Sequence, residues 1–236
     1  MNYSKEGCNL MNKIKLIGVG VIGIMGIILI GVLVLAYLGF VPVLSDLMGT
    51  NKPKNLGVSY SETNYASGLD KVPGAIVLNP EYLCATCAYT SSGSVPVNTS
   101  FTESEFTAMI NKRNSKVGPL RDAQFKFNAD GTVEASGLLI DPRITGPVYV
   151  KGKIDFASGR NATLKLDTAQ IGNITLPADQ AKIAEQIAND TIQKTFAQNP
   201  GLSITSITIE EGKVNFNGTL PKEVSGDPNV IPTQYN

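Results

Sequence analysis

V-Y-V-K-G-K-I-D-F, residues 148–156, is the stretch of sequence that decides the fold class. Apolar side chains fall at every second position and mostly polar ones lie between them, which is the period of a β-strand with one buried face. The turn sequence at 157–161 leads to another alternating segment, which carries Leu164 and Leu166. A connection this short joins antiparallel strands, so we expect a β-hairpin.

More strands are predicted on both sides of this hairpin. Alternation predicts strands over 123–127 and 133–140, joined by the turn sequence at 128–131. A last hairpin is predicted from 203–209 and 213–220. Because all these connections are short, the class is α+β with an antiparallel sheet.

A helix is predicted on each side of the first four strands. The first begins at the capping box formed by Thr102 and Glu105 and runs to about Arg113. Its apolar stripe consists of Phe106, Met109 and Ile110. The second covers 177–197, and we expect its sheet-facing stripe to consist of Ala184, Ile187, Ala188, Thr191, Ile192 and Thr195.

An uncharged segment near the N-terminus predicts a membrane anchor. Leu16–Val41 is 26 residues long, which gives roughly 39 Å of helix against about 30 Å of bilayer hydrocarbon. A cleavable signal peptide is the alternative, but the segment is too long and no A-x-A site follows it. Residues 1–15 carry three lysines and one glutamate, so we expect a cytoplasmic N-terminus and an extracytoplasmic remainder, in a single-pass protein of the cell membrane.

The extracytoplasmic part divides by composition. We expect a spacer with some local structure over 42–100, a folded domain over 101–223 and a flexible tail over 224–236. Outside the cytoplasmic segment the chain carries 17 basic and 19 acidic residues, so no basic surface for nucleic acid is expected.

Catalytic signatures are missing from the sequence. The chain has no histidine, so Ser/His/Asp and Cys/His arrangements are impossible. No glycine-rich phosphate-binding motif lies between a strand and a helix. We therefore expect no enzyme, no catalytic residue, no bound metal and no cofactor.

Cys84 and Cys87 form the one motif with possible chemistry. A zinc site would need more ligands, and only Cys8 remains, on the other side of the predicted anchor. A structural disulfide that closes a tight loop is the expectation for an extracytoplasmic pair. A redox-active dithiol and unpaired thiols remain open alternatives.

Several segments of the predicted domain carry a resemblance to a known group. They are the helix start at 101–103, the strand 132–140 after its Asp-Gly turn, and the segments 148–152, 171–177 and 211–218. They resemble the YpmS-like and LmeA-like bacterial extracytoplasmic proteins, which are similar to the tubular lipid-binding (TULIP) superfamily. The resemblance covers about residues 101–221. It implies a strongly curved antiparallel sheet wrapped on a long helix, with an apolar groove for lipid tails.

The predicted ligand is therefore a membrane lipid or another amphiphile. The groove candidates are Phe125, Phe127, Val148, Val150, Ile154, Phe156, Leu164 and Leu166. Each CH₂ group that a groove buries contributes about 0.8 kcal/mol, so a small groove suffices to hold a lipid. An ordinary packed core is the alternative for these side chains. The alternative function is a non-catalytic scaffold that meets a protein partner in the cell envelope.

Overall fold

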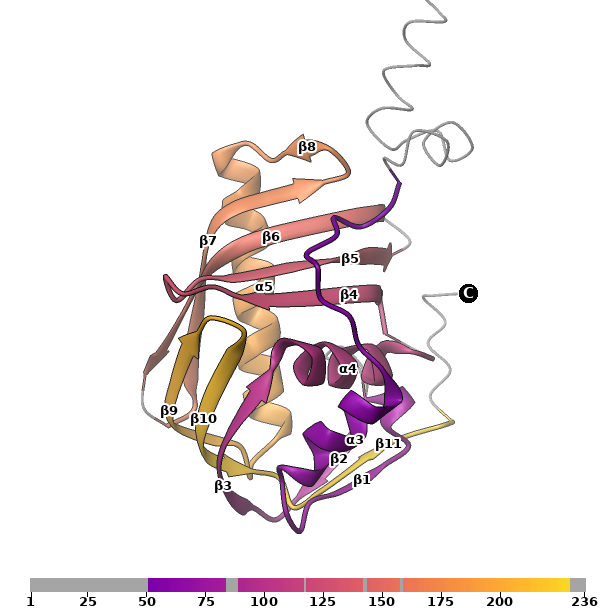
Figure 1. The fold of residues 1–236 in the computed structure, drawn as a ribbon, viewed down its shortest axis with the longest axis vertical. Coiled ribbons are helices and arrows are strands. Elements are labelled where there is room, and N and C mark those ends of the chain that lie inside the picture. Colours follow the sequence, from indigo (N-terminus) through magenta and orange to yellow (C-terminus); the bar gives the residue numbers. More distant parts are fainter. Residues whose placement is uncertain (1–50, 84–88, 117, 142–143, 158, 230–236) are drawn as a thin grey trace, which may run out of the picture. The chain divides into compact units, whose positions relative to one another are not determined.

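The computed structural model describes residues 51–83, 89–116, 118–141, 144–157 and 159–229. They form an α+β fold with curved antiparallel sheets, so the predicted class is confirmed (Figure 1). The proposed anchor, 16–41, lies outside the described residues. Within the described part of the chain, no helix combines the length and the apolarity needed to cross a membrane.

The largest sheet contains the predicted hairpins in chain order. Its strands are β4 (Leu120–Phe127), β5 (Val133–Asp141), β6 (Ile144–Ala157), β7 (Asn161–Ile171) and the short β8 (Ile174–Thr175). All neighbours pair antiparallel in the order β4-β5-β6-β7-β8. β8 reaches only the last two residues of β7, so most of β7 is an edge strand, as β4 is at the other side.

Two small sheets combine strands from both ends of the described chain. In one, β10 (Lys213–Leu220) lies between β3 (Val95–Thr102) and β9 (Ser203–Glu210), with antiparallel pairing. In the other, β11 (Glu223–Gly226) lies between β1 (Ile76–Leu78) and β2 (Tyr89–Ser92). The β1–β11 pair is parallel, which differs from the fully antiparallel expectation.

The folded part of the chain begins earlier than the sequence suggested. The expected spacer, 42–100, contains α3 (Glu62–Asp70), the short helix η1 (Pro80–Tyr82), β1, β2 and most of β3. The expected tail, 224–236, begins inside β11. β1, β2 and β11 are three or four residues long, too short to show a clear period. β1, β2 and β3 pair with partners more than 100 residues away.

Helix α4 (Glu103–Asn114) closes the free edge of β4 with polar side chains. Glu103 accepts a hydrogen bond from the Phe127 amide at 2.7 Å, and Thr107 accepts one from the Phe125 amide at 3.0 Å. One turn later, the Asn111 carboxamide bonds both the amide and the carbonyl of Ala123, at 2.9 and 2.8 Å. The helix also begins with the predicted capping box.

Helix α5 (Ala178–Gln198) closes the edge of β7 in the same way. Glu185 accepts from the Leu166 amide at 2.8 Å, and Asn189 bonds both backbone groups of Leu164 at 2.7 and 3.0 Å. Gln193 then donates to the Ala162 carbonyl at 3.1 Å. We call each set of three side chains, four residues apart, an edge ladder.

The geometry of the two element types explains the edge ladders. Four helical residues rise about 6.0 Å, and two strand residues advance about 6.6 Å. A side chain at every fourth helical position therefore stays level with every second strand residue. The prediction of an apolar, sheet-facing stripe on the second helix is wrong in part. Ile187, one of its residues, points away from the sheet and is 62 % exposed.

Glu105 joins α3 to α4. Its carboxylate accepts hydrogen bonds from Ser67 and Lys71 at the C-terminal part of α3, each at 2.6 Å, and from the Thr102 amide at 2.8 Å. Burial alone would raise the pKa of Glu105, but the bonds from Lys71, Ser67 and Thr102 outweigh it and lower the pKa from 4.5 to about 2. The carboxylate is therefore ionised at every physiological pH.

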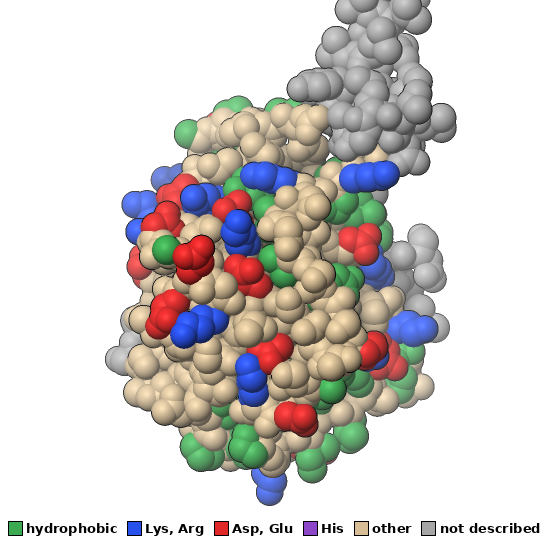
Figure 2. Space-filling view, in the orientation of Figure 1, with side chains coloured by type: hydrophobic (Ala, Val, Ile, Leu, Met, Phe, Trp, Pro, Cys, Tyr) green, Lys and Arg blue, Asp and Glu red, His purple; other side chains and the backbone are tan. Residues whose placement is uncertain are grey.

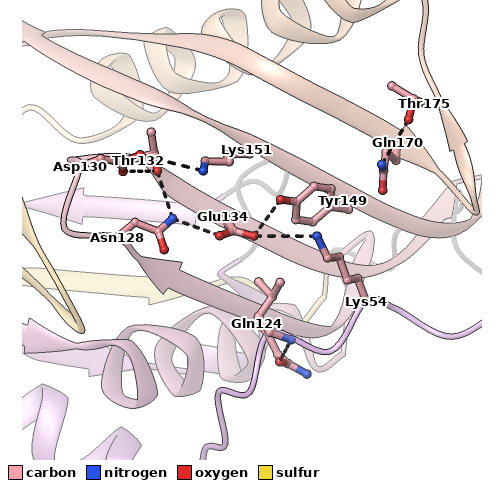
Figure 3. A network of polar contacts seen from close by, with 11 residues as sticks. Lys54, Gln124, Asn128, Asp130, Thr132, Glu134, Tyr149, Lys151, Gln170 and Thr175 are labelled. Carbon is pink, nitrogen blue, oxygen red and sulfur yellow. Dashed lines mark hydrogen bonds and ion pairs between the residues drawn. The ribbon is translucent and has the colours of Figure 1, made fainter.

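Residues 52–58 cross the polar face of the large sheet (Figure 3). Gln124 accepts from the backbone amides of Leu56 and Val58, at 2.8 and 3.4 Å. Lys54 lies 3.6 Å from the centre of the Tyr149 ring, whose hydroxyl donates to Glu134 at 2.7 Å. Burial and the Glu134 carboxylate both raise the pKa of Tyr149.

The apolar core lies between the small β3-β10-β9 sheet, the end of the large sheet where β6 meets β7 at residues 154–162, and the C-terminal end of α5. Its buried members are Val72, Val97, Phe101, Ala162, Phe196, Ile204 and Phe216. Figure 2 shows acidic and basic side chains interspersed over one face of the molecule, with apolar side chains grouped at its lower end. Ile76 and Leu78 of β1 are among the exposed large apolar residues.

Replacing the central residue of the α5 edge ladder should open the edge of β7. We expect Asn189→Leu to lower the free energy of unfolding by about 1–3 kcal/mol, because both backbone groups of Leu164 lose their partner. Hydrogen exchange at the Leu164 amide should become faster. The control Gln186→Leu changes an exposed position of the same helix and should leave that exchange rate unchanged.

Removing the Glu105 charge should weaken the contact between α3 and α4. The lowered pKa means that Glu105 stabilises the fold above about pH 4.5 and that this contribution, roughly 3 kcal/mol, is lost as the pH falls towards 2. Urea denaturation of Glu105→Gln should show that loss at pH 7 and a flatter acid dependence. Glu62→Gln, which removes an exposed ion pair with Lys112, should change stability by less than about 0.5 kcal/mol.

Candidate functional site

An apolar cavity lies where α3 and α4 meet the two small sheets. Its volume is about 260 Å³. Every lining side chain is apolar except Arg113. The lining consists of Leu69, Val72, Ala75, Val77, Phe101, Phe106, Met109, Ile110, Arg113, Ile207, Val214, Phe216, Leu220, Pro221 and Val224. We call this space the apolar chamber.

The predicted stripe of α4 forms one wall of the apolar chamber. Phe106, Met109 and Ile110 lie at positions i, i+3 and i+4, and Arg113 continues the same face at i+7. An adjacent face of α4 is fixed to β4 by its edge ladder, and Phe106 of the stripe also packs against Phe125 and Phe127 of β4. Gly68 lets α3 approach closely, since a Cβ atom there would lie 3.2 Å from the Met109 sulfur.

The small sheets supply the other walls. Val214 and Phe216 lie two residues apart on β10 and therefore face the same side of their sheet. Phe101 is the β3 partner of Val214, and Ile207 is the β9 partner of Phe216. Val77 of β1 lines the chamber, whereas its neighbours Ile76 and Leu78 are 47 % and 46 % exposed. Alternation along β1 thus divides an inner side from an outer one.

A smaller, more polar cavity adjoins the apolar chamber. It measures about 100 Å³ and shares Arg113, Leu220, Pro221 and Val224 with the larger space. Tyr89, Thr195 and Asn199 add three polar side chains to its lining. We call this space the polar chamber.

Among the described residues, Arg113 carries the one charge that borders both chambers. Partial burial of the guanidinium lowers the pKa of Arg113, although the residue as a whole keeps an exposed surface. Tyr89 and Tyr65 act on the pKa in the opposite direction. Among the described residues, none forms a hydrogen bond or an ion pair with Arg113. Its place in the last turn of α4 is favourable for a cation, because the helix dipole is negative there.

Tyr89 and Asn199 are joined inside the polar chamber. The Asn199 Nδ2 donates to the Tyr89 hydroxyl at 2.5 Å and to the Thr195 carbonyl at 2.7 Å. The Tyr89 oxygen therefore acts as an acceptor in this pair, and its own proton is directed elsewhere. Asn199 is buried and ends α5, so the last turn of that helix fixes the position of the tyrosine.

The eight predicted groove residues lie on one face of the large sheet but not in either chamber. The strand registers place Phe125, Ala135, Val150 and Ala169 in one row and Ile154 beside Leu164. Phe127 is 3 % exposed and the other seven are half-buried. Ile154 and Phe156 pack against the main core. The groove on this face stays a prediction.

Two of the groove candidates contact a side chain that lines the apolar chamber. Phe125 and Phe127 touch the apolar chamber indirectly, through edge-to-face contacts with Phe106 at 5.1 and 5.6 Å between ring centres. Cys84 and Cys87 lie outside the described residues, so the expected disulfide stays a prediction. Within the described part of the chain, no three acidic or cysteine side chains are grouped as metal ligands would be.

Sequence reasoning missed Arg113 and the walls built from β1 and β11. The signal for Arg113 was its position seven residues after Phe106, which places a charged side chain on the apolar stripe of α4. Val77 and Val224 gave no comparable signal, because their strands are three and four residues long.

Comparisons with known proteins were made for the whole chain. It matches no protein-family model, no curated protein and no solved structure. The resemblance to the YpmS-like and LmeA-like proteins therefore stays a prediction.

Filling part of the apolar chamber should be tolerated. We expect Ala75→Val to leave the free energy of unfolding unchanged or to raise it by about 1 kcal/mol, because the added methyl groups enter unoccupied apolar space. The control Ala123→Val should lower it by about 1–3 kcal/mol, since Ala123 has 0 % exposure. Equal destabilisation of both variants in urea denaturation would contradict the cavity.

Proposed function

We propose that this chain is a membrane-anchored extracytoplasmic protein that binds the apolar chain of a lipid or another amphiphile. The observation that carries the proposal is the apolar chamber of about 260 Å³. An engineered apolar cavity of about 150 Å³ already stays dry and binds benzene, so a larger one accommodates a larger apolar group. Ligand sites are typically concave, mostly apolar and equipped with few polar groups, as this one is.

The proposed anchor supports this function by its sequence. The uncharged segment 16–41 and the lysines before it favour a single membrane span with the remainder of the chain outside. Only residues 42–50 separate that segment from the described fold. A membrane lipid is therefore a ligand with a nearby supply.

A scaffold that binds an envelope protein is the second candidate, and one surface favours it. Ile183 and Ile187 lie one turn apart on α5 and are 60 % and 62 % exposed. Large apolar side chains that are grouped on a surface often belong to contact sites. We favour lipid binding because the apolar chamber is a cavity of about 260 Å³, whereas the exposed surface on α5 is represented by these two side chains.

Binding in the apolar chamber is testable through Met109. It is the only one of the five methionines that lies beyond residue 48, so a labelled methionine methyl group reports on the chamber wall. The full chain in phosphatidylcholine nanodiscs should show a saturable shift of the Met109 methyl signal when decanol is added. An unchanged Met109 signal at every decanol concentration would contradict the proposed function.

Two substitutions on β1 provide a matched control for this titration. Val77→Phe should abolish the shift or weaken binding at least tenfold, because the larger ring occupies the apolar chamber. Leu78→Phe places the same ring on the outer side of the same strand and should bind decanol as the natural chain does. Equal effects of the two variants would show that decanol does not bind between these walls.

A further inference from the structure

Arg113 and the two chambers indicate which kind of amphiphile fits the site. Of the described side chains that line the apolar chamber, only Arg113 offers a partner for a charged or polar head group. The polar chamber adjoins it and adds Tyr89 and Asn199. A molecule with an apolar chain and a compact polar head matches this division of the space.

The sign of the head group follows from the charges around Arg113. The guanidinium is permanently protonated in proteins and always donates hydrogen bonds. No acidic side chain among the described residues lies within ion-pair distance of it. Partial loss of hydration without a counter-ion is unfavourable for a charge, and an anion placed at the guanidinium compensates for it.

Tyr89 adds a second donor. Because its oxygen accepts the hydrogen bond from Asn199, its proton is available for a ligand. Within the described part of the chain, no protein acceptor for that proton is present. The polar chamber therefore presents donors from Arg113 and Tyr89, which suit an acceptor-rich group such as a carboxylate or a phosphate.

The size of the polar chamber limits the head group. Its volume of about 100 Å³ corresponds to roughly three water molecules. A carboxylate or a phosphate group is compact enough for a space of this volume.

We propose that the ligand is an anionic amphiphile, with its apolar chain in the apolar chamber and its carboxylate or phosphate bound by Arg113 and Tyr89. This inference rests on the proposed function and adds the charge of the ligand to it. A fatty acid and a monoalkyl phosphate share this chemistry, and the experiment separates them.

The test compares four probes that share a ten-carbon chain. Decanoate, decyl phosphate, decanol and decylammonium are titrated into the full chain in phosphatidylcholine nanodiscs, with the Met109 methyl signal as the readout. At least one of the two anions should bind about tenfold or more tightly than decanol, and decylammonium should bind most weakly. The tighter anion identifies the head group as a carboxylate or a phosphate.

Variants assign the preference to the two donors. Arg113→Gln should remove the advantage of the anion and leave decanol binding unchanged, whereas Arg113→Lys should retain part of the advantage. Tyr89→Phe should reduce anion binding several-fold. Lys116→Gln removes a nearby exposed positive charge that lines neither chamber and should change nothing.

The outcomes separate the two proposals. Equal binding of all four probes, or an anion preference that persists in Arg113→Gln and Arg113→Lys alike, would overturn the anionic head group and leave the proposed function in place. Failure of every probe to shift the Met109 signal would overturn both. A preference for decylammonium would contradict the charge assignment directly.

Discussion

The unpaired edges of the five-stranded sheet are the constraint on which the rest of the structure depends. An open edge exposes backbone amides and carbonyls that need partners. Here a helix lies along each edge and supplies them from side chains four residues apart. Once α4 is fixed to β4 in this way, its apolar stripe lines the space towards α3 and the small sheets, while Phe106 also contacts Phe125 and Phe127 of β4. The apolar chamber is thus a consequence of how the sheet edge is closed.

Elements with a long, regular pattern were predictable from the sequence. The hairpin of β6 and β7 and the capping box of α4 were both placed correctly. The buried face of α5 was predicted only in part: Ile192 packs against the core, but Ile187 is exposed, and the hydrogen bonds to β7 come from Glu185, Asn189 and Gln193. Those residues are four apart, so the period was present in the sequence but in polar side chains.

The candidate site was predictable only where one helix forms it. Phe106, Met109 and Ile110 were identified as a stripe, and Arg113 lies at the next position of that face. The remaining walls depend on pairing between β1 and β11, whose residues are far apart in the chain. Local periodicity contains no information about such pairing. The search for a groove therefore favoured the large sheet, where the alternation is strongest.

The position of β11 also determines when the apolar chamber is able to form. This strand lies between β1 and β2 and pairs with both, so neither has a partner in this sheet before residues 223–226 are present. The hydrogen bond between Asn79 and Gly226 joins residues 147 positions apart. Because the chain is made from its N-terminus, this contact forms late. During synthesis, α3 and α4 can meet early through Glu105, but the wall that contains Val224 is added last. The chamber consequently forms only after residues 223–226 have been made, and a chain released before β11 is complete leaves those apolar walls uncovered.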